Sequence, residues 1–538
     1  MYKRCVVFFG IFMFAFCVAF FSLDYLANKE NLHDAALNQQ YYKLKIADIR
    51  GGIYDCRNVP LVNKTKKLVA AAIPCTETLS VLTPIVSKDK ERELYEKCSQ
   101  KMPFTIEVKE KINCPFVKIF EVPVRYSGVT LAAHAIGYLS GDKKGVCGLE
   151  KAFDDYLFNK EQDIYVTYGV DASGKILPGE KEFTEDKSYF KSKGIVLNLD
   201  SRIEALAEET ANKYITRGAV IISEVPNCEI RAFASFPSFT PQNVSAYLND
   251  KNSPLLNRAL CDFNLGSIFK LVTSAAALQK GIGADTLYNC QGVNKVEDTN
   301  FKCFNSKKHE IINMEQALAY SCNGYFIELI KKMPNSTLLN MAKTLKLGQP
   351  ITLAPEMVSK PGLLPTEKSL ENIKTLANFS FGQGKLMATP IQITGLINAI
   401  ASKGVYSNPK LIKGLTDESM KIVKTDIVPD VKERVIYENT AAILKSHMKA
   451  SIEYGTSEKG KPENTSAAAK TSTAQTGIIE DGKRIDQSWF AGFFPYENPK
   501  YSIVILSEAG RGGGESCGPV FKEITEKMIS DIPDLFIS

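Results

Sequence analysis

The hydrophobic pattern of the chain begins with a continuous apolar run near the N-terminus. Residues Cys5 to Leu23 contain no charged side chain and are dominated by Phe, Val, Ala and Ile. As an α-helix rising about 1.5 Å per residue, this run spans roughly 28 Å, close to the hydrocarbon thickness of a bilayer. Lys3 and Arg4 precede the run, and the positive-inside rule then leaves residues 1–4 in the cytoplasm. The pattern predicts a transmembrane anchor at residues 5–23.

A cleaved signal peptide is the alternative interpretation of this run. Its cleavage site would need small residues at positions −1 and −3, whereas the run ends in Phe20-Phe21-Ser22-Leu23-Asp24-Tyr25. An uncleaved anchor is therefore favoured. No later stretch reaches about eighteen uncharged apolar residues, so we expect a single-pass protein of the cell membrane with its remaining residues outside the cytoplasm.

Two regions with different patterns follow the anchor. Residues 24–190 alternate lysine-rich polar loops with short apolar segments, which is typical of a mixed α/β domain. From Gly194 onward, β-type runs form two hairpin-like pairs near the ends of the region (218–223 with 229–234, and 489–493 with 501–506). Helical periods occur beside these pairs (201–214 and 520–529). Residues 194–538 are therefore predicted to form an α+β domain with a central antiparallel sheet flanked by helices.

Composition narrows the class of protein. Of the 538 residues, 44% are apolar and 23% are charged, which excludes a disordered chain and a fibrous protein. The 66 basic and 60 acidic residues give a net charge of +6 that is spread along the whole chain. Because nucleic-acid binding needs clustered basic residues, we expect no nucleic-acid partner. Thirteen cysteines are too few for a disulfide scaffold.

The first motif with chemical potential is Ser267-Ile268-Phe269-Lys270, which opens an apolar helical pattern that runs to Gln279. A serine at a helix start is often only an N-cap. A lysine three residues later shares a helix face with the serine, so its amine can reach the hydroxyl. Burial would favour the neutral amine, which can take the hydroxyl proton. Ser-x-x-Lys alone is nevertheless common by chance.

Two further fragments follow in order along the chain. Ser321-Cys322-Asn323 lies between two helical patterns, where serine and asparagine can act simply as cap residues. Lys470-Thr471-Ser472-Thr473 follows three alanines and has the small, β-branched character of an edge strand. Each fragment alone is a weak signal, but the ordered set of three motifs is specific.

The ordered set Ser-x-x-Lys, Ser-x-Asn and Lys-Thr-x-Thr resembles the penicillin-recognising serine transpeptidases and β-lactamases. Further matches narrow the resemblance to class B penicillin-binding proteins, the monofunctional cell-wall transpeptidases. These matches are spread over nearly the whole chain: Arg50-Gly51, Gly148-Leu149-Glu150, Asn257-Arg258-Ala259, Phe381-Gly382-Gln383-Gly384, Thr389-Pro390-Ile391-Gln392, Gly455-Thr456 and Trp489-Phe490-Ala491-Gly492. The resemblance implies an elongated pedestal or dimerisation-like domain at residues 24–190 and a penicillin-binding transpeptidase domain at residues 194–538.

The resemblance also implies acyl transfer that requires no cofactor for catalysis. Ser267 would attack the carbonyl between the last two D-alanines of a peptidoglycan stem peptide, with Lys270 as general base. Ser321 and Lys470 would pass the proton to the departing D-Ala amine, and Asn323 would orient the substrate amide and the Lys270 amine. β-Lactam antibiotics would imitate the acyl donor and remain attached to the serine.

Substrate binding is implied for the third motif. The Thr471 and Thr473 hydroxyls, together with Lys470, would receive the terminal carboxylate, and the backbone N–H groups of Ser267 and Thr473 would form the oxyanion hole. Ser472 departs from the family, which has glycine at this position. Since glycine lets a substrate strand approach closely, the serine side chain is expected to alter acyl-donor affinity or β-lactam sensitivity.

Cys290, Cys303 and His309 form a Cys-x12-Cys-x5-His pattern between the first two motifs. Two thiolates and an imidazole within twenty residues suit a structural Zn²⁺ site, completed by a carboxylate such as Asp298 or Asp285. Two other interpretations stay open, a local disulfide, which is natural outside the cytoplasm, and three unrelated residues. A metal here would support the cleft and would take no part in catalysis.

Three functional hypotheses follow from these observations. An active D,D-transpeptidase is favoured, acting on peptidoglycan stem peptides beside a membrane glycosyltransferase or polymerase partner. The second hypothesis is a catalytically weak structural partner of a cell-wall synthesis complex. A β-lactam sensor or hydrolase is disfavoured, because a sensor needs further membrane segments and a β-lactamase has no use for a pedestal.

Overall fold

The computed structural model describes residues 2–27, 41–100, 102–158, 163–171, 176, 183–185, 193–480 and 482–536. The chain divides into two compact units, each built from segments that alternate along the sequence. The first comprises Met1–Arg50, Asn63–Arg125 and Phe158–Ser192, and the second comprises Gly51–Val62, Tyr126–Leu157 and Lys193–Ser538. Residues 51–62 and 126–157 therefore belong with the C-terminal region, although the sequence pattern groups them with residues 24–190.

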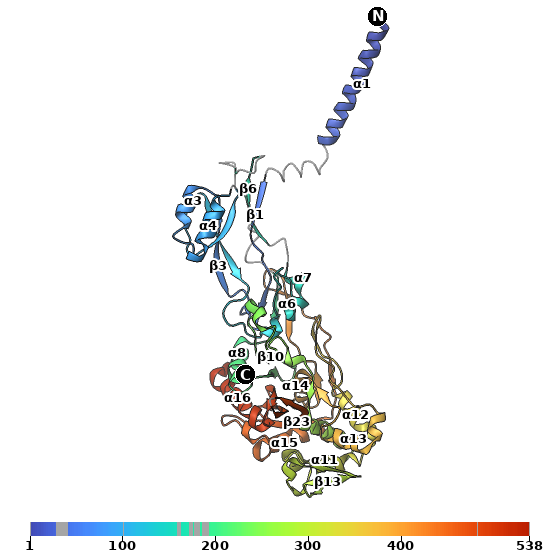
Figure 1. The fold of residues 1–538 in the computed structure, drawn as a ribbon. Coiled ribbons are helices and arrows are strands. Elements are labelled where there is room, and N and C mark those ends of the chain that lie inside the picture. The colour runs from blue at the N-terminus through green and yellow to red at the C-terminus, as the bar shows by residue number, and fades with distance from the viewer. Residues whose placement is uncertain are drawn as a thin grey trace. The chain divides into compact units, whose positions relative to one another are not determined.

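The first unit starts with helix α1 (Tyr2–Ala27), which contains the predicted anchor. Residues Tyr2–Tyr25 are long and apolar enough to cross a membrane, with a mean hydropathy of 2.6, and form the one such helix in the described part of the chain. Beyond α1, the described residues of this unit form two three-stranded antiparallel sheets and two α-helices. Figure 1 shows how these elements are arranged within the unit. The elements are β1 (Tyr41–Ala47), β3 (Thr65–Ala72), α3 (Thr76–Leu82), α4 (Glu91–Cys98), β4 (Phe104–Val108), β5 (Val117–Val124), β6 (Ile164–Gly169) and β7 (Phe183–Glu185).

Strand β3 forms the centre of this unit because both of its faces are buried. Side chains alternate between the faces of a strand. Val69 and Ala71 pack with residues of β1 and β6, whereas Ala70 and Ala72 pack with residues of α3 and α4. The mixed α/β character predicted for this region is confirmed.

The second unit is built on a five-stranded antiparallel sheet in the order β10-β9-β25-β24-β23. Its strands are β9 (Gly218–Glu224), β10 (Glu229–Phe236), β23 (Ala468–Glu480), β24 (Lys483–Phe494) and β25 (Tyr501–Gly510). Both predicted hairpins are present, and pairing of β25 with β9 joins them into one sheet. The strand that carries the third motif, β23, lies at the edge of the sheet, as its composition predicts.

Helices cover both faces of this sheet, as the alternation along β25 requires. Ile503 and Ile505 pack with α8 (Ser201–Asn212) and α16 (Gly518–Asp531) on one face. Val504 and Leu506 face the larger core, which contains α9 (Lys270–Gln279), α14 (Pro390–Ala401) and α15 (Glu438–Tyr454). The predicted α+β domain with a central antiparallel sheet is confirmed.

The remaining elements of the second unit are short. Its other helices are α5 (Ala133–Ile136), α6 (Gly148–Ala152), α7 (Asp154–Leu157), α10 (Met314–Ala319), α11 (Asn323–Ile330), α12 (Asn335–Thr344) and α13 (Ile373–Ser380). A four-stranded sheet joins β2 (Gly52–Tyr54), β8 (Gly194–Leu197), β20 (Ile412–Thr416) and β21 (Ile422–Lys424). Two-stranded pairs complete the unit: β11 (Phe263–Asn264) with β18 (Met387–Ala388), β12 (Tyr288–Cys290) with β15 (Glu310–Ile312), β13 (Val293–Val296) with β14 (Thr299–Lys302), β16 (Thr352–Ala354) with β17 (Met357–Val358), and β19 (Val405–Ser407) with β22 (Lys432–Arg434).

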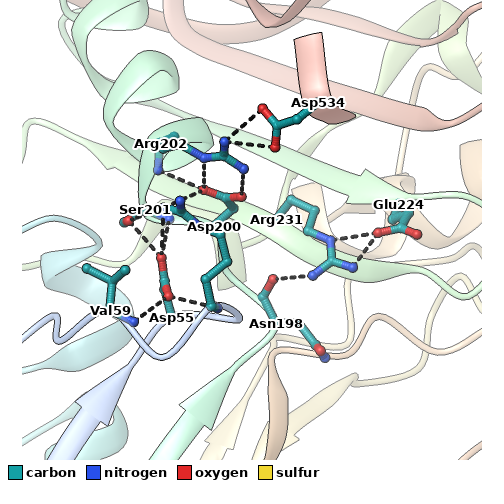
Figure 2. A network of polar contacts seen from close by, with 10 residues as sticks. Asp55, Val59, Asn198, Asp200, Ser201, Arg202, Glu224, Arg231 and Asp534 are labelled. Atoms are coloured by element: carbon teal, nitrogen blue, oxygen red, sulfur yellow. Dashed lines mark hydrogen bonds and ion pairs between the residues drawn. The ribbon is translucent and has the colours of Figure 1, made fainter. Parts of the chain in front are cut away.

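A polar network explains why residues 51–62 belong to the second unit (Figure 2). The buried Asp55 carboxylate accepts hydrogen bonds from the backbone N–H and the hydroxyl of Ser201, the latter at 2.7 Å. Asp200 caps α8 by accepting from the Arg202 backbone, and the Arg202 guanidinium contacts both oxygens of Asp534 at 2.9 Å. Charge-assisted bonds of this kind are stronger than neutral ones, so the network fixes the segment on α8.

Candidate active site

Ser267 lies in a 3₁₀ turn, Gly266–Phe269, that leads directly into α9. The predicted helical pattern is present and ends at Gln279 as expected, but the α-helix itself begins at Lys270 rather than at the serine. Ser267 is therefore not the N-cap of α9, and the N-cap interpretation is wrong. In a 3₁₀ turn, residues i and i+3 eclipse one another. This geometry brings the Lys270 Nζ to 3.1 Å from the Ser267 Oγ.

The Lys270 amine is fully buried and surrounded by oxygen atoms. The carbonyl oxygens of Ser321 and of the Asn323 side chain lie 2.7 and 2.8 Å from the Nζ, and the Ser321 hydroxyl lies 3.0 Å away. Carbonyl oxygens only accept hydrogen bonds. In a neutral amine these two carbonyl oxygens would accept from the two N–H groups, which would leave the lone pair for a hydroxyl, that of Ser267 or Ser321. Burial lowers the pKa of Lys270 to about 8, which favours this neutral form.

The second motif is held at the entrance to α11. Ser321 has a φ of 57°, in the left-handed region that non-glycine residues rarely adopt, and Asn323 is the first residue of the helix. The Asn323 side chain also donates a hydrogen bond to the Lys302 carbonyl at 2.9 Å. The side-chain amide is thus fixed from both ends, and its oxygen is directed at Lys270.

Lys470 projects from β23 and is also fully buried. Its amine donates to the Thr471 carbonyl at 3.0 Å and to the Thr456 hydroxyl at 3.3 Å. Burial lowers the pKa of Lys470 well below its usual range, and the nearby Lys270 charge lowers it further. Thr456 also accepts a hydrogen bond from the Thr471 hydroxyl, so it is a member of the site that the sequence identified only as a family match.

The third motif lies beside a glycine loop that follows β25. The Gly513 N–H donates to the Thr473 hydroxyl at 3.2 Å, and a side chain on Gly513 would overlap the backbone of Ser472. The Ser472 side chain itself is buried and donates to the Leu265 carbonyl at 2.6 Å. It therefore points toward the turn of Ser267, whereas the sequence reasoning assigned it to the surface that a substrate strand approaches.

The predicted metal ligands Cys290, Cys303 and His309 come together, with Cys322 as the fourth member of the cluster. Their ligand atoms all lie within 4.8 Å of one another. The carboxylates suggested as a fourth ligand, Asp298 and Asp285, are not members of this cluster, whose fourth group is the Cys322 thiol at the start of α11. The position of Cys322, thirteen residues after His309, was the signal that the sequence analysis missed.

The distances in this cluster separate the alternatives that the sequence left open. The Cys290 and Cys303 sulfurs are 3.7 Å apart, and both thiols are free, so the disulfide interpretation is wrong. The other sulfur pairs are 3.7 and 3.4 Å apart, and His309 Nδ1 is 3.3 Å from the Cys290 sulfur. Tetrahedral Zn²⁺ with Zn–S bonds of about 2.3 Å separates its sulfurs by about 3.8 Å. The residues therefore fit a Cys3His zinc site.

Comparisons with known proteins agree with this geometry. Residues 218–526 match the penicillin binding protein transpeptidase domain. The chain is 27% identical over 421 residues to stage V sporulation protein D of Bacillus subtilis, covering 75% of this chain and 62% of that protein. It is 28% identical over 478 residues to the peptidoglycan D,D-transpeptidase FtsI of Buchnera aphidicola, covering 84% and 78%.

Solved structures share the fold. Penicillin binding protein 3 of Mycobacterium tuberculosis superposes with a TM-score of 0.66 at 20% identity, covering 91% of this chain and 97% of that chain. A chain of the complex between the penicillin-binding protein PBP2 and MreC of Helicobacter pylori gives the same TM-score and identity, covering 91% and 99%. The family domain covers more than half of this chain. The chain therefore belongs to the penicillin-binding protein transpeptidase family, as a class B penicillin-binding protein.

Proposed function

We propose that this protein is a peptidoglycan D,D-transpeptidase that cross-links stem peptides through an acyl-enzyme on Ser267. The observation that carries the proposal is the buried Lys270 amine, which lies 3.1 Å from the Ser267 hydroxyl and 2.7 and 2.8 Å from two carbonyl oxygens that can accept from its N–H groups. A neutral amine in this position can take the hydroxyl proton as the serine attacks a carbonyl carbon.

The proposed reaction has two acyl transfers. Ser267 Oγ forms a bond to the carbonyl carbon between the last two D-alanines, and its proton passes to Lys270. The C–N bond then breaks, and the terminal D-Ala amine leaves with a proton delivered through Ser321 and Lys470. In the second transfer, the amine of a neighbouring stem peptide attacks the carbonyl carbon of the ester. The bond from this carbon to Ser267 Oγ breaks, and the proton lost by the amine passes through the same groups to the Oγ, which restores the hydroxyl. The product is a new peptide bond, the cross-link.

Binding of the donor is assigned to β23 and its neighbours. Lys470, Thr471 and Thr473 would hold the terminal carboxylate, and Asn323 would orient the donor amide. The backbone N–H groups of Ser267 and Thr473 would stabilise the oxyanion, a contribution typically worth about 3 kcal/mol per donor. β-Lactams would acylate the same serine, in keeping with the ampicillin and aztreonam complexes solved for the M. tuberculosis neighbour.

Intact-mass analysis of the soluble fragment after incubation with a β-lactam tests this proposal. We expect one adduct of the antibiotic's mass per chain, which peptide mapping locates on Ser267. Acylation at another residue would contradict the assignment. No adduct would favour the second hypothesis, a catalytically weak structural partner in a cell-wall synthesis complex.

The proposed location follows from α1. We assign this helix to the membrane, with residues 1–4 in the cytoplasm and the catalytic unit outside it. Within the predicted pedestal region, 24–190, the segments of the first unit would act as the pedestal. Residues 194–538, joined in the second unit by residues 51–62 and 126–157, would act as the transpeptidase domain, with a membrane glycosyltransferase supplying the glycan strands. That a similar penicillin-binding protein was solved in complex with MreC supports a protein partner for this chain.

The proposed reaction requires no cofactor, but the cluster of Cys290, Cys303, His309 and Cys322 is proposed to hold a structural Zn²⁺. The contacts of Cys303 with Cys322 and His309 lower the pKa of the Cys303 thiol, and the Cys303 thiolate in turn raises the pKa of Cys322. Several buried thiolates close together repel one another, and a bound Zn²⁺ would compensate their negative charge. Because Cys322 lies between Ser321 and Asn323, the metal would hold the second motif in place.

A structural metal predicts a large loss of stability on chelation. The purified fragment should contain close to one zinc per chain by elemental analysis, and a strong chelator should lower its melting temperature by about 10 °C. Cys322→Ser should cause both losses, whereas the control Cys261→Ser, which lies outside the cluster, should keep the metal. Metal-free protein whose melting temperature is insensitive to chelator would end the zinc proposal.

A further inference from the structure

Ser472 stands where the family has glycine, and its side chain is used in a contact that glycine cannot make. Residues 470, 472 and 474 share one face of β23, the face that packs on the turn of the nucleophile. Ser472 is 2% exposed, and its hydroxyl donates to the Leu265 carbonyl at 2.6 Å. Leu265 is two residues before Ser267, so the contact joins β23 directly to the turn that carries the nucleophile.

The backbone that leads into this turn is also held by hydrogen bonds at neighbouring residues. The Asn264 N–H donates to the Gln487 side chain at 2.6 Å, and the Trp489 indole donates to the Asn264 carbonyl at 2.9 Å. The Gly266 N–H donates to the Gly382 carbonyl at 3.0 Å. The Leu265 carbonyl completes this set through Ser472. Since Leu265 is fully buried, removal of the hydroxyl would leave its carbonyl without that partner.

Gly266 lies directly against the Ser472 side chain. Its φ of 65° lies in the left-handed region, and a Cβ built on it would overlap the Ser472 hydroxyl oxygen. The small residue that close packing requires therefore lies on the turn at Gly266, which leaves room on β23 for a side chain.

We propose that Ser472 is a positioning residue, whose hydroxyl holds the Leu265 carbonyl and thereby fixes the Ser267 Oγ relative to the Lys270 amine. The inference rests on the proposed function, because it takes Ser267 as the nucleophile. A small displacement of the turn would lengthen the 3.1 Å contact between the hydroxyl and the amine, and acylation is sensitive to such displacements. The contact also couples the nucleophile to the strand that would hold the donor carboxylate.

The test separates positioning from binding and from stability. Ser472→Ala and Ser472→Gly are measured by saturation kinetics with a fluorescent penicillin, which gives the acylation rate constant and the dissociation constant separately. We expect both variants to lower the rate constant about fivefold, the effect of losing one neutral hydrogen bond. The dissociation constant should change less than about twofold, because Lys470, Thr471 and Thr473 are unaltered.

Ser502→Ala provides the matched control. Ser502 is fully buried in the same sheet, on β25, which β24 separates from β23, and its hydroxyl contacts the Ser223 hydroxyl at 2.7 Å. This control should lose stability and keep the wild-type acylation rate constant. If Ser472→Ala fails to fold, Ser472→Gly, which restores the family residue, decides the matter.

The outcomes distinguish the inference from the proposed function. Wild-type acylation together with an unchanged rate constant in the Ser472 variants would overturn the positioning role alone. A change confined to the dissociation constant would also overturn it and assign Ser472 to binding. Wild-type protein that is not acylated at all would overturn the proposed function and, with it, this inference.

Discussion

Replacing Ser267 by alanine is expected to abolish covalent labelling by a β-lactam while leaving the fold intact. The hydroxyl is the atom that would form the ester, so its removal stops the reaction before any intermediate is formed. The structural cost should be small, because the side chain is not a helix cap and, among the described residues, makes one hydrogen bond, to the Lys270 amine at 3.1 Å. Loss of one such bond costs about 1 kcal/mol, which would lower the melting temperature by about 4 °C or less.

Fluorescent-penicillin labelling and a melting curve check this expectation together. The matched control is Ser274→Ala, on α9 directly after the turn of Ser267, where a buried hydroxyl has no hydrogen-bond partner among the described residues. That variant should be labelled at the wild-type rate. A covalently labelled Ser267→Ala protein would show that another residue is the nucleophile.

The chemistry of the site could be predicted from the sequence where it depends on local spacing. Residues three apart share a face whether the turn is α-helical or 3₁₀, so the pairing of Ser267 with Lys270 did not depend on the exact start of the helix. The edge position of β23 likewise followed from local composition. The distances from Lys270 to Ser321 and Asn323 could not be predicted, because they depend on how α9 and α11 pack.

Two features of the site depend on tertiary contacts and were therefore assigned wrongly or missed. In the sequence, Cys322 stands out only as the middle residue of the second motif. Its closeness to Cys290 arises from the packing of α11 against β12, which the sequence does not show. The direction of the Ser472 side chain depends on which face of β23 meets the turn of Ser267. Alternation along a strand indicates which residues share a face, but it does not indicate what that face contacts.

The grouping of residues 51–62 with the second unit is another long-range effect. β2 pairs in parallel with β8, which brings Gly52 opposite Gly194 across about 140 intervening residues of sequence. The sequence pattern on each strand is compatible with several partners, and nothing local selects this one. Asp55 then fixes the segment by accepting hydrogen bonds from Ser201.

Lys270→Ala is expected to lower the acylation rate constant by about a thousandfold, the usual contribution of a general base. The pKa of Lys270 is lowered by burial to about 8, so below this pH most of the side chain is the ammonium, which has no lone pair for the serine proton. As the pH rises through about 8, the neutral amine accumulates, and the wild-type rate constant should rise toward a plateau. Stopped-flow acylation between pH 6 and about 10 measures this profile.

Two further variants decide whether this pH dependence belongs to Lys270. The residual rate of Lys270→Ala should be flat through about pH 8, and the control Lys280→Ala, exposed at the end of the same helix, should keep the wild-type profile.

Lys270→Arg keeps a positive charge that does not titrate in this range. If Lys270 acts only through its charge, the arginine variant should remain active. If it acts as a base, the arginine variant should be as slow as the alanine variant, because a guanidinium cannot accept the serine proton. An alanine variant that retains the rise near pH 8 would instead assign the titration to another group, such as the buried Lys470 amine, whose pKa is also lowered by burial.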